Sequence, residues 1–177
     1  MAKEILIGFA IIIARILASV VMSAGAVYAA MALFDGLTAS IEEWKEMKKG
    51  NLAVGLLFSS VIISMMLLIE PRITDFAFAI QAPSDALPAG TIILVLAFTL
   101  INYLAGLFAG TVLLFLAVNV IDRITPDLDE LAELKKGNLA VALVLAIAVL
   151  LVVFVAREPF EFAFDSLIAL ESAFIPA

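Results

Sequence analysis

The sequence predicts an all-α membrane protein with four transmembrane helices, arranged as two parallel tandem two-span repeats with short amphipathic interfacial helices. Two observations carry this prediction. Of the 177 residues, 65% are apolar and the mean hydropathy is +1.21, whereas soluble domains are typically about 45–50% apolar. The heptapeptide KKGNLAV also occurs twice, at Lys48–Val54 and at Lys135–Val141. We therefore expect membrane lipid to surround a duplicated module.

The repeat extends upstream of KKGNLAV without a gap, at a constant spacing of 87 residues. The further identities pair Asp35, Thr38, Glu43 and Glu46 with Asp122, Thr125, Glu130 and Glu133. Self-similarity at a fixed period indicates a repeated structural unit. The repeat predicts a first two-span module at residues 1–88 and a second at residues 89–177.

Four apolar segments are long enough to cross a bilayer as helices. They are Ile5–Phe34, Leu52–Ile69, Thr91–Ile121 and Leu139–Ala156. The first begins like a signal peptide, but it is too long, contains Arg15 and aligns with an internal segment, so we interpret it as a retained span. The first and third segments exceed the thickness of the hydrocarbon and must tilt or protrude.

Short amphipathic helices are expected in the segments 35–50 and 122–137. Ser40 with Glu43, and Asp127 with Glu130, match the capping-box pattern of a helix start. Apolar residues then recur every third position, which gives each helix one apolar edge for the inner lipid surface.

The sequence GN follows each short helix and predicts a corner. Gly50 and Gly137 are placed where a helix ends in a left-handed conformation. Asn51 and Asn138 are placed to cap the start of the next span. We interpret the corner as a tight interfacial turn, and a ligand site is the alternative.

A Phe-rich stretch follows each second span, at Ile73–Ile80 and Phe160–Leu170. The second stretch separates apolar and acidic residues onto two helical faces. An amphipathic helix on the outer surface is expected, and a partner-docking or re-entrant element is the alternative.

Lysine and arginine counts predict the orientation. The two connecting loops hold Lys45, Lys48, Lys49, Arg123, Lys135 and Lys136, against Lys3, Arg72 and Arg157 on the other side. Because positive residues accumulate in cytoplasmic loops, we expect a multi-pass plasma-membrane protein with both termini outside. Two spans per module keep both copies in the same orientation.

Two polar residues stand inside the long first and third spans. Arg15 and Asn102 occupy equivalent positions of the repeat. An arginine in the hydrocarbon costs about 2.5–3.5 kcal/mol on insertion scales unless it is paired or snorkels. Arg15 could reach lipid headgroups or Glu70, line a polar path or anion site, or bond to Asn102 between subunits.

Small residues follow these polar positions at helical spacing. They are Ser19 and Ser23 in the first copy, and Gly106 and Gly110 in the second. Residues four apart lie on one helix face, and small residues there permit close helix packing. We expect this seam to pack the first and third spans against each other or against neighbouring protomers.

Several functions are excluded or disfavoured by composition. The chain has no cysteine and no histidine, which argues against metal sites and thiol or imidazole chemistry. A net charge of −7 argues against nucleic acid as a partner. No Gly-rich phosphate loop or catalytic triad is present in the sequence, so we expect no cofactor and no enzyme activity.

The pattern of an acidic helix followed by KKGN-L-A-x-A resembles the family called domain of unknown function 350. The second copy carries it best, in Asp122–Pro126, Glu130-Leu131 and Lys136–Ala142, while the first copy has Ala39 and Trp44 at two of these positions. The resemblance implies a small prokaryotic membrane protein of tandem two-span modules, with no catalytic residues to transfer.

Two hypotheses for the function follow. In the first, copies of the chain form a homo-oligomeric assembly with a pore or small-solute pathway, favoured by Arg15 and Asn102. In the second, favoured by the small-residue seam, the protein is a scaffold that recruits a membrane-associated protein partner. The family resemblance associates the second role with envelope or membrane-stress systems.

Overall fold

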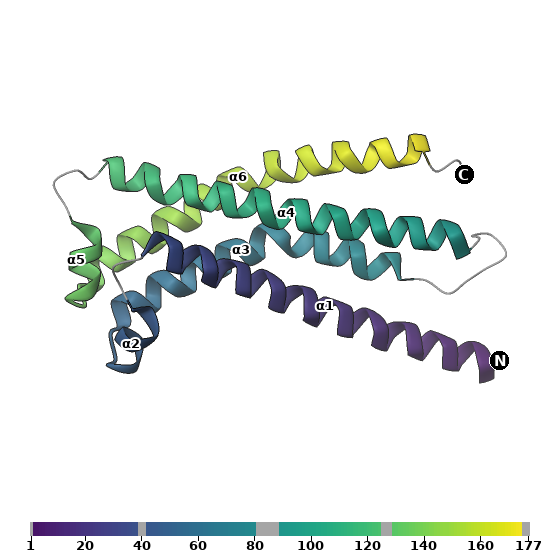
Figure 1. The fold of residues 1–177 in the computed structure, drawn as a ribbon, viewed down its shortest axis with the longest axis horizontal. Helices are drawn as coiled ribbons and strands as arrows, with labels where there is room; N and C mark the ends of the chain where they lie inside the picture. Colours follow the sequence, from purple (N-terminus) through teal and green to yellow (C-terminus); the bar gives the residue numbers. More distant parts are fainter. Residues whose placement is uncertain (1, 39–41, 81–88, 125–128, 175–177) are drawn as a thin grey trace.

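A computed structural model shows an all-helical chain with four long helices and two short ones (Figure 1). It describes residues 2–38, 42–80, 89–124 and 129–174, without the side chains of 122–124 and 166–174. The helices are α1 (Ala2–Leu37), α2 (Glu43–Lys48), α3 (Leu52–Ala79), α4 (Ala89–Ile124), α5 (Glu130–Lys135) and α6 (Leu139–Phe174). The four long helices are apolar and long enough to cross a membrane.

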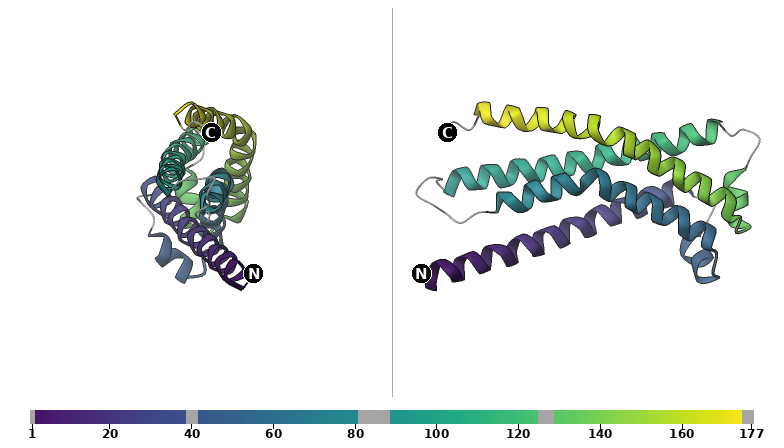
Figure 2. Two further views of the ribbon diagram at one scale, coloured as in Figure 1. Left: turned by 90° about the vertical axis from the view of Figure 1, so that its right-hand side faces the viewer. Right: turned by 180° about the vertical axis from the view of Figure 1, so that it is seen from behind.

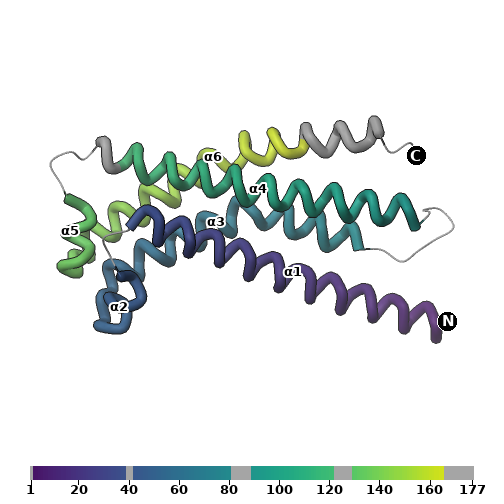
Figure 3. The backbone as a smooth tube through the Cα atoms, in the orientation of Figure 1, coloured from purple at the N-terminus to yellow at the C-terminus, as the bar shows by residue number. Residues whose placement is uncertain are grey.

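The long helices run back and forth along one bundle (Figures 1 and 2). α1 and α4 run from the end that holds both termini, here called the termini end. They lead to the end that holds α2 and α5, here called the corner end, and α3 and α6 return from it. The tube in Figure 3 shows the same path for the chain.

The helix α3 lies at the centre of the bundle. It packs against α1, α4 and α6, and 56% of its most apolar window is buried, against 6% for α1 and 22% for both α4 and α6. Met65, Leu68 and Ile69 of α3 are fully buried. The outer three helices therefore keep most of their apolar side chains on the surface, as expected for helices that face lipid.

The Phe-rich stretches do not form separate surface helices, so that prediction is wrong. α3 continues through Pro71 to Ala79, and α6 continues through Pro159 to Phe174. Phe164, which was assigned to a lipid surface, is buried against the bundle. Helices that span membranes tolerate proline because neighbouring groups satisfy the freed carbonyl.

The short helices begin later than the capping-box pattern predicts. Their N-cap residues are Glu42 and Asp129, and the predicted caps, Ser40 and Asp127, lie outside the described residues. In the first copy the single O–H of Thr38 lies within hydrogen-bond reach of both the buried Glu43 carboxylate and the Phe34 carbonyl oxygen. A threonine at the end of α1 therefore fixes the start of α2.

Candidate functional site

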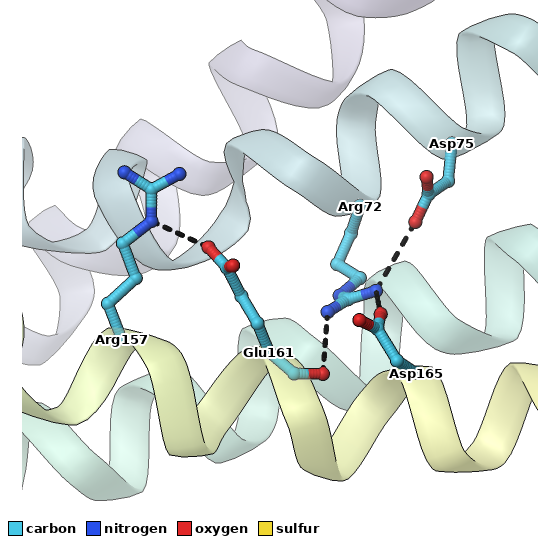
Figure 4. Close-up of polar contacts among 5 residues, drawn as sticks. All are labelled: Arg72, Asp75, Arg157, Glu161 and Asp165. Carbon is cyan, nitrogen blue, oxygen red and sulfur yellow. Dashed lines mark hydrogen bonds and ion pairs between the residues drawn. The ribbon is translucent and has the colours of Figure 1, made fainter.

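A buried arginine links α3 to α6 and is the most unusual polar group of the bundle. Arg72 of α3 is only 1% exposed and is the largest fully buried side chain among the described residues. Its Nη1 lies 3.2 Å from Asp75 Oδ2 and 3.3 Å from Asp165 Oδ1 of α6. Its Nη2 donates to the Glu161 carbonyl oxygen at 3.4 Å (Figure 4). The guanidinium also lies 5.1 Å from the centre of the Phe164 ring.

The arginine is paired, as a buried charge must be. Its carboxylate partners remain accessible, since Asp75 is 41% and Asp165 68% exposed. The arginine is thus inside the bundle while the acids lie at its surface. This arrangement joins α3 to α6 at a polar boundary of the bundle.

A second ion pair lies beside Arg72 and joins equivalent positions of the two copies. Glu70 and Arg157 are separated by the repeat spacing of 87 residues, and the Arg157 Nη2 lies 3.5 Å from Glu70 Oε2. Arg157 Nε also donates to Glu161 Oε1 at 2.6 Å (Figure 4). Equivalent positions of the two copies therefore lie close together here. They carry opposite charges that attract, whereas the same charged residue at both positions would repel.

The glycine seam packs beneath this arginine. A Cβ atom at Gly106 would lie 3.4 Å from Arg72 Cγ and 3.4 Å from Ile69 Cδ1, and one at Gly110 would lie 3.4 Å from Met65 Sδ. Gly106 and Gly110 thus pack against α3, which occupies the centre of the bundle. The seam prediction named α1 or a neighbouring protomer as the partner. The closest contacts of these glycines are with α3 instead of α1, and packing between protomers stays a prediction.

The other half of the predicted seam and its polar residues lie apart from this packing. Ser19 and Ser23 are partly exposed on α1, whereas Asn102 is buried on α4 with 6% exposure. Arg15 Nε donates to the Ile80 carbonyl oxygen at 3.0 Å, and the guanidinium lies 5.3 Å from the centre of the Phe78 ring. Arg15 therefore caps the C-terminal end of α3, where a cation is favourable, instead of pairing with Glu70.

Sequence reasoning missed the hydrogen bond that joins α1 to α4. The Tyr103 hydroxyl donates to the Met22 carbonyl oxygen at 2.6 Å. A Cβ atom at Gly25 would lie 2.7 Å from that hydroxyl oxygen, so only glycine leaves room for it. The signal was the tyrosine beside Asn102 in an apolar span, because a buried tyrosine hydroxyl usually finds a partner.

The corners adopt the predicted geometry. Gly50 has a φ of 85° and Gly137 a φ of 79°. The Asn51 side chain accepts from the N–H groups of Ala53 and Val54. Asn138 caps α6 in the same way, because its side chain accepts from the N–H groups of Ala140 and Val141. Bonds from the glycine and asparagine N–H groups back to the short helix complete a Schellman motif.

The amide groups of the two corner asparagines differ in their partners. Asn51 Nδ2 donates to the Leu134 carbonyl oxygen of α5 at 2.9 Å, so the first corner is tied to the second. Asn138 Nδ2 donates to Glu133 Oε2 at 2.8 Å. That bond, followed by the bond from Lys136, lowers the pKa of Glu133.

A cavity of about 150 Å³ lies at the corner end of the bundle. Its polar lining comes from Thr38, Asn119 and Glu130, and the rest is apolar. The carboxylate of Glu130, the repeat equivalent of Glu43, is buried there. Among the described residues no cluster of three or more carboxylates could hold a metal ion.

Two stretches of the chain match the model of a known family. The family model described as Domain of Unknown Function (DUF350) matches residues 8–105 and, a second time, residues 95–170. No curated protein and no solved structure matches the chain. The two family matches cover nearly the whole sequence, and the chain therefore belongs to the Domain of Unknown Function (DUF350) family.

Proposed function

We propose that the protein is a non-enzymatic scaffold of the plasma membrane, assembled from several copies, that holds its corner helices rigidly for a membrane-associated protein partner. One observation carries this proposal. The polar side chains within the bundle tie helices together: Arg72 joins α3 to α6, Tyr103 joins α4 to α1, and Arg15 joins α1 to α3. Polar side chains that bond one helix to another in this way make the bundle rigid.

The surface offered to a partner lies at the corner end. Trp44 of α2 is 53% exposed beside the ion pair of Lys45 with Glu42, and Lys48 and Lys49 are also exposed. Exposed tryptophan surrounded by charge is typical of binding surfaces. The same composition suits α2 and α5 to the lipid interface, so a partner would approach along the membrane.

The orientation is part of the proposal: parallel modules, corners in the cytoplasm and both termini outside. Support comes from the excess of lysine in the connecting loops and from the common direction of α1 and α4 (Figure 1). Single cysteines at Ser84 and Ala132 should react oppositely with an impermeant maleimide added to intact cells, Ser84→Cys being labelled. Labelling of both or of Ala132→Cys alone would reject this orientation.

A pathway between copies is the second candidate function. It is favoured by the partial exposure of Ser19 and Ser23, which would give α1 a polar stripe toward a neighbouring copy. The centre of a single copy does not offer such a path, because Met65, Leu68 and Ile69 fill it.

Ion flux separates the two functions. Purified protein in liposomes should release potassium and a small fluorescent anion no faster than protein-free liposomes if the scaffold proposal holds. A protein-dependent flux that Ser23→Leu reduces, while the lipid-facing control Val144→Leu does not, would replace the scaffold with the pathway. Val144 is 65% exposed on α6 and serves as the matched surface site.

A further inference from the structure

The cavity at the corner end is lined by residues from both copies of the repeat. Phe34 of α1 and Leu57 of α3 line it from the first copy, and Glu130 of α5 and Leu145 of α6 line it from the second. Asn119 of α4 also belongs to the wall. The volume is about 150 Å³, and an engineered apolar cavity of about this size binds benzene. The cavity can therefore take a small organic molecule.

The cavity lies where the second copy has smaller side chains than the first. Leu131 of α5 and Leu145 of α6 line it, and their equivalents in the first copy are Trp44 and Phe58. The rings of Trp44 and Phe58 pack edge to face with their centres 5.7 Å apart, so aromatic side chains occupy the space between α2 and α3. Leucine is smaller than either ring, which leaves room between α5 and α6.

The polar groups of the cavity present acceptors of hydrogen bonds. Glu130 is 7% exposed, and a carboxylate has about four acceptor positions, so it can bind a ligand in addition to its contacts within the protein. Asn119 Nδ2 donates to the Phe115 carbonyl oxygen at 2.7 Å, which leaves the amide oxygen as an acceptor. The single O–H of Thr38 is engaged by acceptors of α1 and α2. A ligand of this cavity must therefore be a donor.

Charge and surroundings narrow the ligand to a protonated amine with an apolar body. Among the described residues that line the cavity, Glu130 alone is ionisable, and a buried carboxylate is costly unless a cation or a donor lies next to it. Phe34 and Val61 belong to the apolar part of the wall, which suits hydrocarbon, whereas a metal ion would need several oxygen ligands. Leu57 and Leu145 lie in the second turn of α3 and α6, so the cavity is at the end of the apolar spans, where amphipathic groups keep their charge near water.

We infer that the cavity binds a small primary ammonium ion whose apolar body has about six carbon atoms, the size of benzene. The ammonium group donates to the Glu130 carboxylate and to the Asn119 amide oxygen, and the body lies against Phe34 and Leu145. A phospholipid headgroup suits the cavity less well, because its phosphate would bring a second negative charge close to Glu130. The site goes beyond the proposed scaffold, because it gives the corner end a ligand of its own.

Two fluorinated probes test the site. Protein in phosphatidylcholine nanodiscs is titrated with 4-fluorobenzylamine, which is cationic at neutral pH, and with 4-fluorobenzyl alcohol, a neutral molecule of similar shape. Fluorine NMR measures the saturable binding beyond that to empty nanodiscs. The amine should bind at least about tenfold more tightly than the alcohol, because only the amine makes charge-assisted hydrogen bonds. Equal binding of the two probes, or no saturable binding of the amine, would overturn the inference.

Two variants then locate the binding, one by charge and one by volume. Glu130→Gln should weaken amine binding about tenfold, whereas Glu133→Gln, which removes a charge from the same helix outside the cavity, should not. Leu145→Phe, which copies Phe58 of the first copy, should fill the cavity and abolish binding, whereas Leu143→Phe, at a 50% exposed site of α6, should not. Thermal unfolding without the probe identifies variants that are folded.

The remaining outcomes each reject the site. Unchanged amine binding in folded Glu130→Gln or in folded Leu145→Phe would place the probe outside this cavity. A loss in the two control variants as large as in their partners would do the same. If phosphatidylethanolamine in the nanodiscs displaces the amine, a lipid headgroup and not a small free amine occupies the cavity.

Discussion

The helices α3 and α6 begin with the same residues after the same corner, yet they occupy different environments. The first is surrounded by three helices, with 56% of its most apolar window buried, and the second lies at the edge, with 22% buried. Two copies of one repeat cannot both place their second helix in the centre of one bundle. The duplication therefore creates one central helix and one outer helix, and their sequences differ accordingly.

Equivalent positions of the two helices show this adaptation. Ser60 and Ser64 of α3 are buried, whereas their equivalents, Ile147 and Leu151 of α6, are 47% and 58% exposed. Small side chains at the centre let neighbouring helices approach, and large apolar ones suit lipid. Position in the bundle, more than position in the repeat, thus determines side-chain size.

The largest difference between the two copies in the effect of a substitution on the free energy of unfolding is expected at Arg72. Arg72→Ala should lower the free energy of unfolding by about 3 kcal/mol, because it empties a buried site and leaves two carboxylates without their cation. Unfolding in mixed micelles measures this loss. Pro159→Ala, at the equivalent exposed position of α6, should not lower the value, because it removes a proline from the interior of a helix.

Arg72→Met separates the charge from the packing. A buried ion pair can often be replaced by an apolar side chain of similar volume at little cost, so this variant should recover more than half of the loss. If Arg72→Met is as damaging as Arg72→Ala, the ion pairs themselves hold α3 to α6, and the packing explanation is wrong.

The next effect concerns the glycine seam on α4. Gly106→Ile should destabilise the fold by about 2 kcal/mol, since the added carbons would enter the contacts with Arg72 and Ile69. Leu104→Ile, at a 54% exposed site of the same helix, is the control and should be neutral. Ser19→Ile, the equivalent change in the first copy, should leave the fold of the single chain intact. Equal losses at Gly106 and Ser19 would remove the distinction between the copies.

Much of the fold follows from the sequence, because hydrophobic length and an exact repeat report directly on spans and corners. The glycines of the corners, for example, are fixed by local backbone geometry, which the residues Gly50-Asn51 and Gly137-Asn138 encode by themselves. Local backbone geometry therefore determines this part of the structure.

The site was harder to predict because it depends on which helix becomes central. Arg72 counted only as a positive charge outside a span, since nothing local shows that α6 supplies Asp165 93 residues later. Gly106 was expected in a close helix contact, but its partner α3 follows from packing three helices around one. The end of α3 at Ile80, which accepts from Arg15, was likewise invisible because the helix passes its proline.

At the corners the two copies should behave alike. Gly50→Val and Gly137→Val should each cost about 1–2 kcal/mol, because a side chain is strained at positive φ. Unfolding in mixed micelles again measures the cost, and Gly36→Ala, in the helical and open site of α1, is the control. A loss at one corner only would show that the repeat has diverged there as well.

A smaller effect is expected where equivalent positions meet with opposite charge. A double-mutant cycle of Glu70→Ala and Arg157→Ala should give a coupling energy of about 0.5 kcal/mol, since both side chains are partly exposed. The coupling should weaken in high salt. Coupling indistinguishable from zero would mean that Arg157 acts through Glu161 alone.

The smallest effect distinguishes the acidic residues of the two corners. The pKa of Glu133 is lowered first by Asn138 and then by Lys136, whereas the pKa of Glu46 is lowered first by Lys49. Asn138→Ala should therefore raise the pKa of Glu133 more than Asn51→Ala raises that of Glu46, as carboxyl NMR titration can measure.

Because both pKa values lie below the ordinary 4.5, these bonds stabilise the fold above that pH and are lost as the pH falls through the lowered values. Asn138→Ala should remove part of this acid-sensitive stability. Equal pKa changes at the two corners would show that Asn51, despite its bond to Leu134, serves its own short helix as Asn138 does.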